Sequence, residues 1–325
     1  MISSLRKLLA HQLKNNKPKI NHGGFTLIEL LVAMIVAVLI IAPLLRFMIT
    51  IVDTDRKEQA KATSEQEIQA AMDYIARDLE QAVYIYDASG VERDNNDEPD
   101  KSGIRKEIPP VANEVGGCNK GNCQPVLVFW KRKYFYREDK VNGKTIGDFT
   151  NKNDTFVYAL VAYYLITEEN DKWSNIARIG RFEVYDKIID VTSNKVNKVG
   201  IPASPGFKSF DLSKKGNSLK EKLNQWTKED APYTTQAQIL VDYIDNKATA
   251  ITPDCPNNYS LVPSEPKGGF YACVDAEKRI AQLFLIGNAL ARLKNNPNDY
   301  EYKPNRSSYF PTVTMQIEGR GFLGL

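Results

Sequence analysis

Histidine is nearly absent from this chain. Its 325 residues include two histidines, His11 and His22, so the segment from residue 25 to residue 325 has none. Histidine is the usual general base at neutral pH, a usual member of nucleophilic triads and a common ligand of catalytic zinc. The segment after residue 24 therefore excludes a triad hydrolase and a histidine-bound metal enzyme, and we predict no catalytic residue in it.

Acidic residues are absent from the first 24 positions. This segment carries five basic residues, namely Arg6, Lys7, Lys14, Lys17 and Lys19. The chain from Phe25 to Val52 is then apolar, with Glu29 and Arg46 as its ionisable side chains. As a helix, this run rises about 1.5 Å per residue and can cross a hydrocarbon layer about 30 Å thick. Because positive charge collects on its N-terminal side, we predict a single membrane span with the N-terminus in the cytoplasm.

The apolar run opens with the sequence Gly23-Gly24-Phe25-Thr26-Leu27-Ile28-Glu29. This stretch resembles the prepilin signal of type IV pilins and type II secretion pseudopilins. The resemblance implies that a prepilin peptidase cleaves after Gly24, that the new amine of Phe25 is N-methylated, and that the helix assembles with other pilins or pseudopilins. It also implies a place in the cytoplasmic (inner) membrane, with the remaining chain in the periplasm or at the cell surface after assembly.

Glu29 is the one acidic residue of the apolar run. A carboxylate in hydrocarbon costs roughly 3 kcal/mol unless it finds a cation or a donor. The amine of Phe25 in a neighbouring subunit would supply that cation, so we predict that Glu29 helps to set the axial register between subunits. An ordinary single-span protein with an incidental glutamate would share the hydropathy, but not the joint placement of Gly24, Phe25, Thr26 and Glu29.

An apolar stripe continues beyond the membrane-spanning run, and glycine is absent between Phe25 and Ser89. The stripe recurs at spacings of three and four, through Ile68, Ala71, Met72, Ile75, Leu79, Ala82, Val83 and Tyr86. We predict that most charged neighbours lie on the solvent face, namely Glu65, Glu67, Asp73, Arg77, Asp78 and Glu80. This periodicity predicts one helical rod of about 95 Å, whose second half packs on a sheet.

Strands follow the polar segment from Gly90 to Gly121. Runs of β-branched and aromatic residues predict strands at 125–130, 133–136, 155–166, 177–185, 238–243 and 312–317. Residues 280–293 suit a strand or a helix, and Gly287-Asn288 favours a strand followed by a turn. The sequence therefore predicts the α+β class, with a long N-terminal helix packed on an antiparallel-rich, pilin-like β-sheet head.

Four segments make up the predicted chain. They are a basic leader at 1–24 that is removed, a transmembrane and filament-core helix at 25–52, an amphipathic half of the helix at 53–88, and an extracytoplasmic β-rich head at 89–325. The head, of roughly 240 residues, is large enough to bury a core. Removing the five basic leader residues from a formal net charge of +3 leaves −2. This near-neutral balance argues against a nucleic-acid partner.

Cysteine is scarce, and its four residues fall into two local sets, Cys118 with Cys123 and Cys255 with Cys273. The predicted compartment is oxidising, so we predict at least one disulfide and leave the connectivity open. The spacings are poor for a zinc site built from all four residues, and we predict no metal there.

Oxygen-bearing side chains collect in one polar loop, at Asp94, Asn96, Asp97 and Asp100. Calcium prefers such ligands, but the loop lacks the glycine that an EF-hand requires. Two interpretations are open, a calcium site and a solvated acidic loop, and the second requires no cofactor.

Three segments carry a narrower resemblance, residues 56–67, 73–86 and 319–323. They resemble the cyanobacterial hormogonium polysaccharide secretion pseudopilins. This resemblance implies a minor subunit of a type IV pilus-like secretion apparatus that supports polysaccharide release and gliding motility. It also implies an assembly platform protein and, indirectly, an assembly ATPase as partners, together with polysaccharide contact.

Two other functions are left open. A minor type IV pilin or J-type type II secretion pseudopilin would act in pilus priming, adhesion or DNA uptake. A binding role would require an exposed basic or aromatic patch, for which residues 131–134 are the candidate. A membrane-anchored glycan-active enzyme would require a pair of carboxylates and no histidine.

Overall fold

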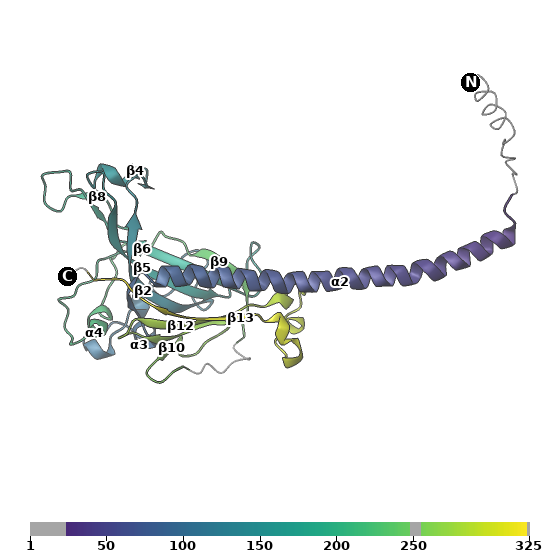
Figure 1. Ribbon diagram of the computed structural model, residues 1–325. Helices are drawn as coiled ribbons and strands as arrows, with labels where there is room; N and C mark the ends of the chain where they lie inside the picture. The colour runs from purple at the N-terminus through teal and green to yellow at the C-terminus, as the bar shows by residue number, and fades with distance from the viewer. Residues whose placement is uncertain (1–23, 248–254, 324–325) are drawn as a thin grey trace, which may run out of the picture. The chain divides into compact units, whose positions relative to one another are not determined.

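The computed structural model describes residues 24–247 and 255–323 (Figure 1). The predicted leader therefore lies outside the described residues, except for Gly24. The chain divides into two compact units, residues 1–55 and residues 56–325. The division falls within helix α2, Leu27–Leu79, which has 53 residues and is continuous through Pro43.

The first unit contains the apolar part of α2. Every residue from Gly24 to Asp55 is exposed, including the large apolar side chains between Leu27 and Val52. A helix that is apolar on all sides needs an apolar medium around it. By length and composition, α2 is able to cross a membrane.

The second unit begins with the remaining turns of α2, which bury one face. The buried apolar residues of this part are Ala60, Ile68, Ala71, Met72, Ile75, Ala76 and Leu79. Those from Ile68 onward recur at spacings of three and four and share one core with residues of both large sheets, such as Phe129 and Leu283. This arrangement confirms the prediction that an amphipathic part of the helix packs on a sheet.

The helix is shorter than predicted. We expected helix through residue 88, but α2 ends at Leu79 and strand β1 covers Ala82–Ile85. The rod is therefore about 80 Å long, not 95 Å. The sequence from Val83 to Tyr86 is β-branched and aromatic, which favours a strand. Ala82, Val83 and Tyr86 are buried as the stripe suggested, but they are buried by the sheet.

The main sheet has five antiparallel strands in the order β1-β2-β5-β6-β9. After β1, its strands are β2 Cys123–Phe135, β5 Thr155–Ile166, β6 Ala177–Tyr185 and β9 Gln238–Ile244. The runs predicted at 155–166 and 177–185 coincide with β5 and β6. The two runs predicted at 125–130 and 133–136 form one strand, because Lys131 and Arg132 between them also pair with β5.

The second sheet has four antiparallel strands, β10 Ser260–Val262, β11 Phe270–Asp275, β12 Ile280–Ile286 and β13 Thr312–Glu318. The strand and turn predicted within 280–293 are confirmed, since Gly287-Asn288 leads from β12 into the 3-10 helix η5, Ala289–Arg292. Strand β11 was not predicted. All six of its residues are buried, so its sequence lacks the alternation of a half-exposed strand.

Short elements complete the head and confirm the α+β class. They are the strand pairs β3 Lys140–Val141 with β4 Lys144–Thr145 and β7 Ile188–Ile189 with β8 Val199–Ile201, the helices α3 Ala88–Glu92 and α4 Leu219–Leu223, and the 3-10 helices η1 Pro99–Lys101, η2 Arg105–Glu107, η3 Ile146–Asp148, η6 Pro297–Asp299 and η7 Pro304–Tyr309.

Buried charges join the last turn of α2 to three strands. Asp78, predicted on the solvent face, is 6% exposed. Tyr163 of β5 donates its hydroxyl to Asp78 Oδ2 at 2.7 Å, and Arg181 of β6 donates its Nε–H to the same oxygen at 2.8 Å. Lys131 of β2 donates to the other carboxylate oxygen. The prediction was wrong because helical periodicity does not report donors that approach from other elements.

Glu183 of β6 is the second carboxylate of this cluster. It is paired with Arg181 and Lys133 and lies 3.8 Å from Lys131 Nζ. Burial raises the pKa of Asp78 and of Glu183, but Arg181 and the lysines outweigh it and hold both pKa values below their ordinary range. Burial lowers the pKa of Arg181, and the two carboxylates outweigh that effect in turn. The carboxyl groups of Asp78 and Glu183 are therefore ionised, and each is paired with basic side chains.

Candidate functional site

The predicted processing site precedes helix α2. Gly24 and Phe25 lie outside the helix, and the Phe25 side chain is 83% exposed. Apart from the adjoining residues, no described atom comes within 4 Å of the position that a Cβ would take at Gly24. Among the described residues, Gly24 and Phe25 are both exposed, which is compatible with access by a peptidase.

Thr26 and Glu29 bind each other at the start of α2. Glu29 Oε2 accepts hydrogen bonds from the Thr26 backbone N–H and from the Thr26 hydroxyl, both at 3.2 Å. The backbone N–H of Glu29 donates to Thr26 Oγ1 at 3.3 Å. This reciprocal arrangement is a capping box, which satisfies backbone donors that a helix start leaves free. Our sequence reasoning missed it, although the spacing of Thr26 and Glu29 is its known signature.

The capping box leaves the charge of Glu29 unneutralised. Its Oε1 has no hydrogen bond, and no ion pair reaches the carboxylate from any residue that the structure describes. The geometry therefore holds the carboxylate at the start of α2. The pairing of Glu29 with another subunit stays a prediction.

The four cysteines form two disulfides, Cys118–Cys123 and Cys255–Cys273, with Cα–Cα distances of 4.9 Å and 5.5 Å. The prediction of at least one disulfide is confirmed, and both bonds join cysteines of the same local set. Cys123 begins β2 and Cys273 lies in β11, so each bond attaches a loop to a sheet.

In the polar loop considered as a calcium site, the Asp94 carboxylate binds basic side chains of the same chain. Asp94 accepts two hydrogen bonds from Arg105 at 2.9 Å and lies 3.0 Å from Lys106 Nζ. These hydrogen bonds lower the pKa of Asp94 to about 2. Asn96 Oδ1 accepts a hydrogen bond from the backbone N–H of Glu98, and the Asp100 carbonyl accepts one from the Arg93 side chain. Within residues 24–247 and 255–323, no group of three or more His, Cys, Asp or Glu side chains is placed to hold a metal.

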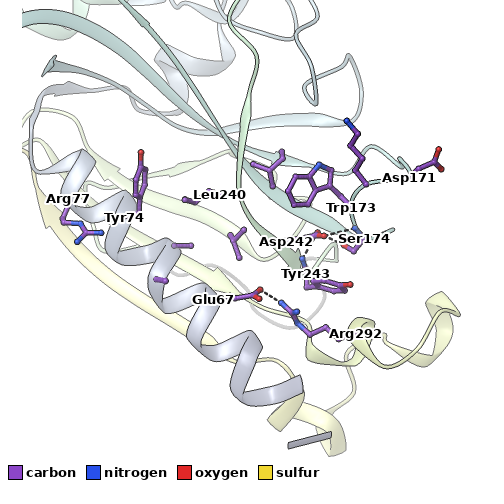
Figure 2. A pocket seen from close by; sticks show the side chains of 15 residues that line it. Glu67, Tyr74, Arg77, Asp171, Trp173, Ser174, Leu240, Asp242, Tyr243 and Arg292 are labelled. Carbon is purple, nitrogen blue, oxygen red and sulfur yellow. Dashed lines mark hydrogen bonds and ion pairs between the residues drawn. The ribbon is translucent and has the colours of Figure 1, made fainter. Parts of the chain in front are cut away.

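A groove of about 700 Å³ opens in the head (Figure 2). Its walls come from α2 between Glu67 and Arg77, from residues 171–174, from β9 and from Arg292. Figure 2 shows Tyr74 and Arg77 on α2 at one side and Trp173 at the other. No sequence pattern pointed to this groove, because its residues come from four separate segments.

Interactions within the groove hold its inner end in place. Asp242 accepts hydrogen bonds from the Ser174 backbone at 2.8 Å, the Ser174 hydroxyl at 2.6 Å and the Tyr243 backbone at 2.8 Å. Arg292 is paired with Glu67. The guanidinium of Arg292 also lies 4.1 Å from the centre of the Tyr243 ring, a cation–π contact.

The rim of the groove is different, because its aromatic rings are exposed and its charged side chains form no ion pair within the described residues. Tyr74 and Trp173 are each 41% exposed, and the Arg181 guanidinium lies 5.9 Å from the centre of the Tyr74 ring. The side chains of Arg77, Asp171 and Lys172 form no ion pair with any described residue, and the Trp173 indole N–H has no hydrogen bond among them. The rim thus offers aromatic faces together with free donors and an acceptor.

Comparison with protein families gives one match. Residues 19–45 match the family model described as the prokaryotic N-terminal methylation motif. No curated protein gives a significant match, and no solved structure does. The motif implies processing by a prepilin peptidase and assembly with other pilins, and with α2 it fits a single-pass inner-membrane anchor. Together, the methylation motif and the long apolar helix support placing this chain in the type IV pilin and pseudopilin superfamily.

Proposed function

We propose that this chain is a minor pilin-like subunit of a type IV pilus-like apparatus that supports hormogonium polysaccharide secretion and gliding motility. The observation that carries the pilin-like assignment is the methylation motif at residues 19–45, joined to an apolar helix whose Glu29 lacks a cation within the described chain. The secretion role is supported by the resemblance of residues 56–67, 73–86 and 319–323 to hormogonium pseudopilins.

Processing prepares the subunit for assembly. A prepilin peptidase hydrolyses the peptide bond between Gly24 and Phe25, and the freed Phe25 amine then receives a methyl group from a methyl donor. The head is outside the cytoplasm at this stage, where both disulfides are stable. The helix start stays in the membrane with its capping box formed.

Assembly then pairs charges between subunits. The Glu29 carboxylate binds the methylated Phe25 amine of a neighbour, which removes an unpaired charge from the hydrocarbon. An assembly platform protein guides this step and a cytoplasmic assembly ATPase supplies its energy. In the assembled structure, the heads contact the polysaccharide as it leaves the cell.

Intact-mass measurement of the protein from its native membrane tests this function. We expect a species that starts at Phe25 and carries one added methyl group, and we expect it to disappear when the prepilin peptidase is deleted. A species that starts at Met1 in both strains would refute the pilin-like pathway. Deletion of the gene should also reduce polysaccharide release and gliding; unchanged release and gliding would refute the secretion role alone.

Two variants of Glu29 separate charge pairing from capping. Glu29→Ala removes both the charge and the capping acceptor, whereas Glu29→Gln keeps an acceptor for Thr26 and loses the charge. We expect both variants to insert and fold, and neither to join filaments. Normal incorporation of Glu29→Gln would show that the cap suffices and would refute charge pairing.

A further inference from the structure

We propose that the groove between Tyr74 and Trp173 binds a polysaccharide chain. The inference rests on the proposed function, because it assigns the polysaccharide contact to a defined surface of the head. The groove has a volume of about 700 Å³ and lies entirely within the second unit. It is therefore large enough for several sugar rings.

Aromatic faces are the first reason. A sugar ring presents a flat face of C–H bonds, and the negative π-face of an aromatic ring attracts those hydrogens. Trp173 is exposed at this site, whereas Trp130 and Trp226 are buried and contact each other with ring centroids 5.4 Å apart. Tyr74 offers a second exposed ring on the opposite wall (Figure 2).

Unused hydrogen-bonding groups are the second reason. Arg77, Lys172 and the Trp173 indole can donate to sugar oxygens, and Asp171 can accept from hydroxyl groups. None of these side chains is engaged with another described residue. Glu67, Asp171 and Asp242 balance Arg77, Lys172 and Arg292 in charge along the groove, so the recognition rests on hydrogen bonds and aromatic faces and not on net charge.

The rigidity of the inner end is the third reason. The contacts of Asp242 with Ser174, and of Arg292 with Glu67 and Tyr243, fix the side chains below the rim. Tyr243 has a φ of +59°, a backbone conformation that few residues other than glycine adopt and that often occurs at binding sites. A fixed site loses less conformational entropy when a ligand binds.

A peptide is the competing class of ligand, because β9 is an edge strand of the main sheet and forms one wall. An added peptide strand would pair with the free backbone of β9. Part of that edge already forms backbone hydrogen bonds. Asn288 donates its backbone N–H to the Tyr243 carbonyl at 2.8 Å, and Ile244 forms a β-bridge with Gly287. The observations therefore favour a ligand that binds side chains.

Fluorescence quenching on the full-length protein in detergent micelles tests the proposal. Trp173 is the tryptophan that acrylamide can reach, because the other two are buried. The probes are fragments of the polysaccharide that the source organism secretes. We expect them to protect Trp173 from quenching.

Calorimetric titration of variants locates the binding. Trp173→Ala should weaken binding of the polysaccharide fragments at least tenfold, whereas Trp173→Tyr should weaken it less than threefold. Phe156→Ala is the matched control, since Phe156 is an exposed aromatic residue outside the groove. Unchanged binding by Trp173→Ala, absence of binding to the fragments, or protection of Trp173 by an extended peptide instead of a glycan would each overturn the proposal.

Filament incorporation distinguishes the two proposals. Trp173→Ala should be cleaved, methylated and incorporated like the wild type, because the groove is remote in sequence from the processing site. A wild-type protein that assembles but binds no glycan fragment would overturn the groove and leave the assembly role intact. A protein that is never cleaved but binds the fragments through Trp173 would overturn the assembly role and keep the groove.

Discussion

Helix α2 carries two carboxylates in opposite environments, Asp78 near its end and Glu29 near its start. Asp78 is buried and receives Lys131, Arg181 and a tyrosine hydroxyl from three strands of its own chain. Glu29 is exposed and receives hydrogen bonds from Thr26, with no cation among the residues that the structure describes. The first carboxylate stabilises the fold of one chain, and the second is available to another chain.

The apolar residues of α2 show the same difference. Between Leu27 and Asp55 the large apolar side chains are exposed on all sides of the helix. Between Arg56 and Leu79 the apolar residues form one buried stripe. A single apolar stripe can be buried against the core of its own chain. An apolar surface on all sides of a helix has to be buried in lipid or against other helices. One helix thus combines a part that folds alone with a part that requires a membrane or a filament.

Replacement of Asp78 tests the buried carboxylate of the head and should have the largest effect on stability. Asp78→Ala leaves Lys131 and Arg181 buried without their shared carboxylate. We expect the free energy of unfolding to fall by about 3–5 kcal/mol. Urea denaturation of the full-length protein in micelles, followed by the fluorescence of buried Trp130 and Trp226, measures this change.

Glu65→Ala is the matched control for that experiment, because Glu65 lies on the same helix, is exposed and has no partner among the described residues. Its effect should stay within about 0.5 kcal/mol. Equal effects of the two variants would mean that the buried cluster does not hold α2 to the sheet.

A pair of methionine variants compares the two parts of α2 directly. Met72 is completely buried and Met48 is 63% exposed. Met72→Ala should lower the free energy of unfolding by roughly 2–3 kcal/mol, because it leaves a cavity in the core. Met48→Ala should leave the same urea transition unchanged. A comparable loss in both variants would refute the view that the apolar part of α2 contributes nothing to the stability of the head.

Acid should weaken the head through the same cluster, by less than Asp78→Ala does, because a protonated carboxyl group still fills its site. The pKa values of Asp78 and Glu183 are lower in the folded protein than their ordinary values of 3.8 and 4.5. Their contribution to stability is complete above those ordinary values and is lost as the pH falls through the lower folded-state values. Urea midpoints measured between pH 6 and pH 3 should therefore fall more steeply in the wild type than in Asp78→Asn.

The sequence predicted those features that local patterns encode. The long β-branched and aromatic runs predicted the bounds of β5 and β6. The prepilin-like stretch, which lies within the matched family model, singled out Gly24, Phe25 and Glu29. The end of α2 was missed because the spacing of Ala82 and Val83 continues a helical period by chance. The burial of Asp78 was missed because its partners lie 53, 85 and 103 residues away along the chain.

The groove was missed for the same reason, since residues 67–77, 171–174, 239–243 and 292 converge only in the folded head. None of these segments has an unusual composition or a recognised motif. Long-range convergence of this kind is determined by sheet order and loop path, which a single sequence does not encode in any local pattern.

The smallest predicted effect concerns the capping box that holds Glu29 at the start of α2. Thr26→Ala removes the hydroxyl that caps the helix and contacts Glu29. We expect the first turn to open more easily by about 1 kcal/mol, which corresponds to roughly fivefold faster amide exchange near Leu30 in micelles. Thr50→Ala is the control, because the Thr50 hydroxyl binds the Arg46 carbonyl inside the helix and not its start. Equal exchange in both variants would mean that the cap does not hold Glu29. Faster exchange confined to Thr26→Ala would mean that Thr26 of the same chain holds the Glu29 carboxylate in place.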